Sequence, residues 1–132
     1  MSDPTRFLND HENSLLYIGK LAALTGATRK AIRHYETVGL LPKPARRGSY
    51  RVYTGRDVFM VHVIKHAQSY GFSLADLRDL VAAIGKQKNF PLKQALTMVE
   101  RKRAALRRQA TELRTLDRRL VGLMRDMRRH FG

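Results

Sequence analysis

One short segment combines hydrogen-bond donors at a spacing that suits contact with an anion. Thr28, Arg29 and Lys30 are consecutive, and Arg33 follows one helical turn later. On a helix, residues three and four apart are neighbours, so these side chains gather at one end of one face. Hydroxyl, ammonium and guanidinium groups donate hydrogen bonds to base edges and phosphate oxygens. The chemistry that this segment offers is recognition of a nucleic acid.

Residues for covalent chemistry are not arranged in a comparable way. No nucleophile–base pair, paired-carboxylate spacing or phosphate-binding glycine loop is present, and cysteine is absent. His62 and His66 are spaced to share a metal ion if a third ligand joined them, but no acidic or thiol partner lies nearby in sequence. The sequence therefore predicts no enzyme, no metal site and no cofactor.

The net charge indicates a polyanionic partner. Lys and Arg number 26 and Asp and Glu 11, for a formal charge of +15. Residues 1–85 carry 12 basic and 7 acidic side chains, whereas residues 86–132 carry 14 and 4. The Arg-rich second part is either a solvated helix face or a surface attracted to a polyanion, and docking of an acidic protein partner is a further hypothesis.

The longest apolar run is Leu80 to Ile84, so we expect a cytoplasmic protein that does not enter the membrane.

Two helices separated by a glycine turn position these donors. A helical pattern begins at Tyr17 and ends at Gly26, and Thr28 is a good N-cap for a second helix to Val38. Prolines after Gly39 prevent its continuation. Residues 46–53, with tyrosine and valine beside Gly48, predict a short β-hairpin.

The rest of the chain reads as three further helices. Thr54 with Asp57 and Ser73 with Asp76 form capping boxes for helices that end at Gly71 and Gly85. A polar linker follows, and Pro91 fits the first turn of a last helix, uninterrupted by proline from Leu92 to Phe131. We therefore expect a flexible arm over 1–14, a binding domain over 15–85, and a linker with a long helix over 86–132.

An apolar stripe runs along the last helix at alternating steps of three and four residues. Nine of its eleven positions are apolar, which is typical of a coiled-coil seam. A helix of about 60 Å cannot bury such a stripe on a small head, so it needs a partner helix. The stripe comprises Leu92, Leu96, Val99, Arg103, Leu106, Ala110, Leu113, Asp117, Leu120, Met124 and Met127.

The two charged positions in the seam indicate the orientation of the partner. Arg103 and Asp117 lie symmetrically about Ala110, so an antiparallel homodimer that crosses there sets each against the other. Leu92 then faces Met127. A parallel pair would stack like charges, which is repulsive. The alternative is that Arg103 extends along the helix to reach water and Asp117 simply faces solvent.

The order of motifs resembles the MerR family of bacterial transcription regulators. The resemblance covers residues 17–84 and the long helix after them. The motifs that carry it are Tyr17-Ile18-Gly19, Thr25-Gly26, Ile32-Arg33-His34-Tyr35-Glu36, Gly39-Leu40-Leu41-Pro42, Ser49-Tyr50-Arg51-Val52-Tyr53 and Gly71-Phe72-Ser73-Leu74. It implies a mainly α fold, with a winged helix-turn-helix head, a short β-hairpin wing and a long C-terminal helix that forms an antiparallel coiled-coil dimer.

The resemblance also implies a function and its residues. Family members bind a pseudo-palindromic promoter operator as homodimers and distort an overlong spacer so that RNA polymerase can engage both promoter elements. Carried over by position, the expected DNA-binding residues are Thr28, Arg29, Lys30, Arg33 and Tyr35, then Arg46, Arg47, Tyr50 and Arg51 in the wing, then Lys65. Two of these have an alternative role: Tyr35 could serve packing only, and Arg47 could simply be solvated.

A family-typical sensor is not expected. Metal-sensing members are expected to place cysteines where this chain has Leu92 and Met127, and no separate effector domain is expected before Gly132. The alternative to promoter control is an architectural or excisionase-like DNA-binding protein with the same head.

Overall fold

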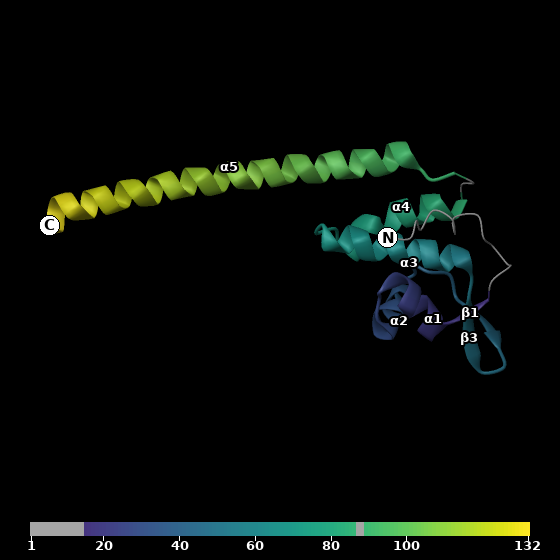
Figure 1. Cartoon of the computed structure of the whole chain (residues 1–132). Coiled ribbons are helices and arrows are strands. Elements are labelled where there is room, and N and C mark those ends of the chain that lie inside the picture. Colours follow the sequence, from purple (N-terminus) through teal and green to yellow (C-terminus); the bar gives the residue numbers. More distant parts are fainter. Residues whose placement is uncertain (1–14, 87–88) are drawn as a thin grey trace. The chain divides into compact units, whose positions relative to one another are not determined.

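The computed structural model describes residues 15–86 and 89–132, which fall into two units divided between Pro91 and Leu92. The expected arm, residues 1–14, lies outside the described residues. We call residues up to Pro91 the head; Figure 1 labels its elements. They are β1 (Leu16–Tyr17), α1 (Ile18–Thr25), α2 (Arg29–Thr37), β2 (Ala45–Arg47), β3 (Tyr50–Tyr53), α3 (Gly55–Ser69) and α4 (Leu74–Lys86).

The turn between α1 and α2 forms as the sequence predicts. Gly26 adopts a left-handed conformation with φ of 74°, and its N–H donates to the carbonyl of Ala22 at 2.8 Å. A left-handed C-terminal glycine is a common way to end a helix. Two residues later, the Thr28 hydroxyl accepts from the N–H of Ala31 at 3.0 Å and caps α2. Both the helix end and the N-cap are confirmed.

The predicted hairpin is present, but it belongs to a three-stranded sheet. β3 lies between β1 and β2, and both pairings are antiparallel, with Arg47 opposite Tyr50 and Leu16 opposite Tyr53. Gly48 has φ of 61° at the turn, which suits the first position of a type II′ hairpin turn. β1 was not predicted, because two residues are too few to show the alternation by which a strand is recognised.

Both predicted capping boxes are formed. At the start of α3, the N–H of Thr54 donates to the Asp57 carboxylate at 2.9 Å, and the reciprocal bond to the Thr54 hydroxyl is 3.3 Å. Ser73 and Asp76 make the same pair of bonds before α4, at 2.8 and 3.0 Å. α4 continues one residue past the expected end at Gly85. The linker prediction rests partly on residues 87–88, which lie outside the described residues.

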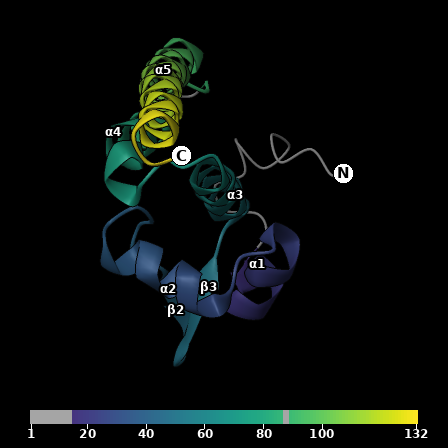
Figure 2. The ribbon, with the colours of Figure 1, turned by 90° about the vertical axis from the view of Figure 1, so that its left-hand side faces the viewer.

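The core of the head is centred on α3. Figures 1 and 2 show α3 between α4 and the pair formed by α1 and α2. It contributes Val58, Phe59, Met60, Val61 and Ile64, all at most 6% exposed. The other buried apolar side chains include Leu21, Ile32, Tyr35, Leu40, Leu41, Val52, Tyr53, Leu77, Leu80, Val81 and Ile84. α2 and the hairpin therefore rest on an apolar centre and leave their other sides to water.

The second unit is a single helix, α5 (Leu92–Phe131), 40 residues long. Its upper bound agrees with the prediction, while Pro91 lies just before it rather than in its first turn. No residue of α5 is buried. In the part of the chain that the structure describes, no helix has the length and apolar character that crossing a membrane requires.

The turn at Gly26 yields the first testable prediction. A Cβ at this position would lie 2.5 Å from the Nζ of Lys65, in addition to the strain of a positive φ. We expect Gly26→Ala to lower the free energy of unfolding by roughly 1–2 kcal/mol, which is the cost of the left-handed conformation, because the flexible end of the exposed Lys65 side chain can move away from the new methyl group. Urea unfolding measures the change.

Gly48→Ala is the matched control, because Gly48 also has a positive φ but nothing lies within 4 Å of the position that a Cβ would take. A similar loss of stability in both variants would show that the backbone conformation, and not the contact with Lys65, sets the cost. An unchanged stability of Gly26→Ala would contradict the structure of this turn.

Candidate nucleic-acid interface

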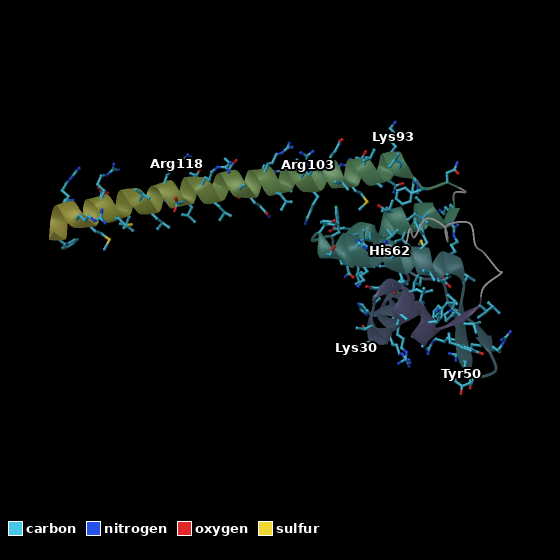
Figure 3. The ribbon with its side chains drawn as sticks, in the orientation of Figure 1. Lys30, Tyr50, His62, Lys93, Arg103 and Arg118 are labelled. Carbon is cyan, nitrogen blue, oxygen red and sulfur yellow. The ribbon has the colours of Figure 1, made fainter. Side chains whose placement is uncertain are left out.

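The N-cap and the first two turns of α2 present the four predicted donors to solvent. Thr28, Arg29, Lys30 and Arg33 are all exposed, while Ile32 is fully buried beneath them. The alternation follows from the helical period, which turns one face of α2 to the core and the other outward. In Figure 3, Lys30 lies on the side of the head that faces away from α4. These positions have the exposure that a recognition helix requires.

Arg29 lies over the first turn of α1. A Cβ on Gly19 would be 2.8 Å from the Nη2 of Arg29, so any other residue at position 19 would require the guanidinium to move. The sequence marks Gly19 as part of a motif but does not give the reason. The guanidinium of Arg29 therefore lies directly beside the backbone of α1.

Tyr35 is placed differently from the other expected contacts. It is 4% exposed, and its hydroxyl donates to Oε1 of Gln68 on α3 at 2.9 Å. Burial raises the pKa of the phenol. A side chain held in this way packs α2 against α3, which is the alternative role that the sequence left open.

The hairpin carries three exposed candidates. Arg46, Arg47 and Tyr50 are all exposed, and Tyr50 is 69% accessible. The ring of Tyr50 meets that of Tyr17 edge to face, with centroids 5.9 Å apart. Figure 3 shows Tyr50 and Lys30 on the same side of the head. The hairpin and α2 therefore present hydrogen-bond donors on the same side of the head.

Arg51 is half-buried and has an intramolecular partner that the sequence analysis missed. Its Nε lies 3.5 Å from Oε2 of Glu36 on α2. The other carboxylate oxygen of Glu36 accepts from the Tyr53 hydroxyl at 2.5 Å. Burial, and then the hydrogen bond to Glu36, raise the pKa of Tyr53 well above its usual range. Glu36 thus ties the recognition helix to the wing.

Lys65 on α3 reaches back to the turn between α1 and α2. Its ammonium lies 3.4 Å from the carbonyl of Thr25, the last residue of α1. A cation at a helix C-terminus is favoured by the helix dipole. Lys65 is exposed, so its charge remains available at the surface beside the helix-turn-helix.

The two histidines on α3 lie close together. The rings of His62 and His66 are 4.1 Å apart between centroids. Desolvation, followed by the charges of His66 and Lys65, lowers the pKa of His62. Within residues 15–86 and 89–132, no group of three or more His, Cys, Asp or Glu side chains is placed to hold a metal ion.

The predicted seam is exposed along the whole of α5. Its large apolar members range from 46% exposed at Val99 to 67% at Leu113. Leu116, Val121 and Leu123 widen the stripe in the second half of the helix, each about half exposed. Leu116 and Leu123 lie three and four residues from Leu113, Leu120 or Met127, and Val121 lies three residues before Met124. This spacing is visible in the sequence, but the three residues were not included in the seam.

The two charged seam positions both face solvent. Arg103 and Asp117 are exposed, and neither takes part in a salt bridge among the residues that the structure describes. Figure 3 shows Arg103 on α5, together with Arg118. The single chain therefore leaves a long apolar surface and two opposite charges unmatched.

Family models recognise both parts of the chain. A model described as "MerR HTH family regulatory protein" matches residues 16–84, which is half of the sequence. A second, described as "MerR, DNA binding", matches residues 60–123. The chain belongs to the MerR family of transcription regulators, and it contains the DNA-binding domain of that family. Its members are regulators rather than enzymes.

Individual relatives agree with this assignment. The mercuric resistance operon regulatory protein of Bacillus cereus is 36% identical over 72 residues, which are 54% of each chain. Heavy metal-dependent transcription regulator 1 of Rhizobium meliloti is 34% identical over 101 residues, 70% of this chain and 68% of that protein. The transcription regulator PbrR691 of Ralstonia metallidurans, solved with lead(II), is 27% identical, with a TM-score of 0.67 over 83% of this chain and 86% of its own.

The link between Tyr53 and Glu36 gives the second testable prediction. Folding raises the pKa of the Tyr53 phenol. The resulting contribution to the free energy of unfolding is fully present below the ordinary pKa of 10.0 and is lost as the pH rises above that value. We expect Tyr53→Phe to lower the free energy of unfolding at pH 7 by about 1.5–3 kcal/mol, because it removes a hydrogen bond to a charged group.

Urea unfolding between pH 7 and 11 measures both effects. The difference between Tyr53→Phe and the wild type is expected to shrink above pH 10. Tyr70→Phe is the control, because Tyr70 is 72% exposed. Equal stability of Tyr53→Phe and wild type at pH 7 would contradict the stabilising role of this bond.

Proposed function

We propose that this protein controls transcription by binding a pseudo-palindromic promoter operator as a homodimer. In this proposal the exposed start of α2 enters the major groove, and the wing and Lys65 contact backbone phosphates on either side. The observation that carries it is the common orientation of α2 and the hairpin, which present exposed cations on the side of the head away from α4. A helix with flanking phosphate contacts is how winged heads read duplex DNA.

The contacts divide into two kinds. Thr28, Arg29, Lys30 and Arg33 are proposed to read base edges and nearby phosphates. Arg46, Arg47, Tyr50, Arg51 and Lys65 are proposed to contact phosphates, which fix the register but carry no sequence information. Tyr35 is proposed to hold α2 in place rather than to contact DNA, since its hydroxyl is engaged by Gln68.

The homodimer is proposed on the basis of α5. Eight large apolar seam residues are about half exposed on a helix with no buried residue. A second copy of the same helix, running antiparallel, covers this stripe and sets Arg103 of one copy beside Asp117 of the other. Two heads joined in this way bind two half-sites related by two-fold symmetry.

The effect on transcription is proposed to come from deformation of the DNA between the half-sites. Many phosphate contacts on both sides of an untouched centre can supply the energy for bending and untwisting an overlong spacer. RNA polymerase in the cytoplasm then engages both promoter elements. The alternative, an architectural protein with the same head, binds random and promoter DNA equally well.

Selection of binding sites from a random duplex library tests the proposal. We expect enrichment of an inverted repeat, and footprinting of the corresponding promoter with and without polymerase should locate it inside a spacer of unusual length. Recovery of no preferred sequence would favour the architectural alternative.

Arg33→Ala is the third testable prediction. Loss of a base-reading guanidinium should weaken binding to the selected operator by about 1–3 kcal/mol per site, with a smaller effect on random DNA. Fluorescence anisotropy over a range of salt concentrations measures both affinities and their salt dependence.

Arg78→Ala is the matched control, because Arg78 is an exposed cation of the same kind on α4. It should produce only a small loss that is equal for both DNAs. Unchanged affinity of Arg33→Ala for the operator would count against this role of α2.

Exchange of the seam charges is the fourth testable prediction. In an antiparallel pair, Arg103→Asp sets the new carboxylate against Asp117 of the other copy at two symmetric places, and Asp117→Arg sets two guanidinium groups together in the same way. Each single change should weaken dimerisation by about tenfold, equivalent to about 1.4 kcal/mol. The double variant, which restores opposite charges, should recover most of the loss.

Sedimentation equilibrium measures the dimer dissociation constants. Arg108→Asp is the control, because Arg108 is an exposed cation that lies outside the seam on the same helix. A double variant as weak as the single ones would exclude the antiparallel register.

A further inference from the structure

A groove separates the end of α2 from the hairpin. Its volume is about 270 Å³, and its lining comes from Glu36 and Thr37 on α2, Lys43 and Pro44 in the loop, and Arg46 and Arg51 in the sheet. A water molecule occupies roughly 30 Å³ in the liquid, so the groove has room for a phosphate group together with water. The groove is open to solvent.

The lining is dominated by cations. Three of the six lining residues are the cations Lys43, Arg46 and Arg51, and Glu36 contributes the one carboxylate. One guanidinium nitrogen of Arg46 donates to the carbonyl of Ser49 at 3.1 Å, which leaves its other N–H groups for a ligand. The excess of positive charge suits an anion with several acceptor oxygens, and the guanidinium forks suit a phosphate in particular.

Glu36 holds its two neighbours unequally. It is 11% exposed, and one oxygen accepts the short 2.5 Å bond from Tyr53. The other oxygen lies 3.5 Å from Arg51, well beyond the roughly 2.7–2.9 Å of a charge-assisted hydrogen bond. Arg51 is 37% exposed at its side chain. The carboxylate is therefore fixed by Tyr53, while Arg51 is held loosely and remains open to a competing anion.

We propose that this groove takes a phosphodiester of the DNA backbone, and that Glu36 is the internal anion which that phosphate replaces at Arg51. This inference rests on the proposed function and names the part of the site that sets the strength of non-specific binding. In free protein, Glu36 neutralises Arg51. On DNA, the phosphate takes over the guanidinium, while Tyr53 continues to hold Glu36.

The exchange has a measurable consequence. Glu36 reduces the affinity for any DNA, because its pair with Arg51 must be broken and its charge remains near the phosphate. Removing the charge without removing the acceptor of the Tyr53 hydroxyl should therefore strengthen binding. Glu36→Gln is the variant that does this, since its amide oxygen can still accept that bond.

Salt-dependent binding of the full-length chain to a short random-sequence duplex tests the proposal. Glu36→Gln is expected to bind about two- to fivefold more tightly, the range equivalent to a half-exposed ion pair. The slope of log K against log salt concentration should steepen by about 0.9 per bound chain. Arg51 then has no internal counter-charge in the free protein, so DNA neutralises one more cation. An affinity and slope equal to the wild type would overturn the proposal.

Two controls separate this exchange from a general charge effect. Asp79→Asn makes the same change in net charge at an exposed position on α4 and should leave the slope unchanged. In an Arg51→Gln background, Glu36→Gln should lose most of its effect, because neighbouring groups that act together are not additive. If Asp79→Asn matches Glu36→Gln, or if the effect persists without Arg51, the proposal is wrong.

A second variant keeps the test decisive if Glu36→Gln does not fold. Lys43→Gln alters an exposed side chain in the groove and should make the slope shallower by about 0.9 per bound chain without a change in melting temperature. An unchanged slope would show that no phosphate enters the groove. A wild-type chain that binds no DNA at low salt would refute the proposed function itself, whereas salt-steep binding with unaltered variants refutes only this inference.

Discussion

Enclosure of α3 is the constraint on which the head depends. Val58, Phe59, Met60, Val61 and Ile64 leave the helix on several sides and are all buried. A helix with apolar side chains on several sides must be covered there by neighbours, and α1 and α4 do so. The same packing fixes α2, because Tyr35 reaches Gln68 of α3. The direction in which the exposed donors of α2 point is therefore set by apolar contacts behind them.

The charges of the head are divided between the fold and its surface. Asp57 and Asp76 accept hydrogen bonds at the N-termini of α3 and α4, and Glu36 accepts from Tyr53. Burial raises the pKa of Asp57, while its bonds to Thr54 oppose that shift. These carboxylates serve local structure, whereas the arginines of α2 and of the hairpin, apart from the half-buried Arg51, are exposed. This division leaves an excess of exposed positive charge on α2 and the hairpin.

α5 follows a different physical rule from the head. None of its 40 residues is buried, and so its apolar stripe can be removed from water only by another element. Its arginines are exposed, and all of them except Arg103 lie outside the seam. In the proposed dimer, the α5 helices set the distance between the two heads, although they contain no candidate for DNA contact. The seam would thus link the oligomeric state to DNA recognition.

Local features of the structure were accessible from the sequence. Gly26, Thr28 and the two capping boxes each make hydrogen bonds to residues at most four positions away. Residue type and spacing therefore determine where α1, α2, α3 and α4 begin or end. The helical period likewise determines that Arg33 is exposed above Ile32 and that an apolar stripe runs along α5. These features need no knowledge of how the elements pack.

Only the tertiary structure decided which distant side chains meet. β1 exists because Leu16 and Tyr17 pair with β3, far along the chain, rather than because of any preference of two residues. Glu36 is engaged by Arg51 and Tyr53, and Lys65 by Thr25, although 15 or more residues separate each pair. Spacing along a chain determines neighbours within a helical turn. Contacts between distant residues depend on how whole elements pack together. The sequence alone would equally have allowed the Glu36 carboxylate to face water.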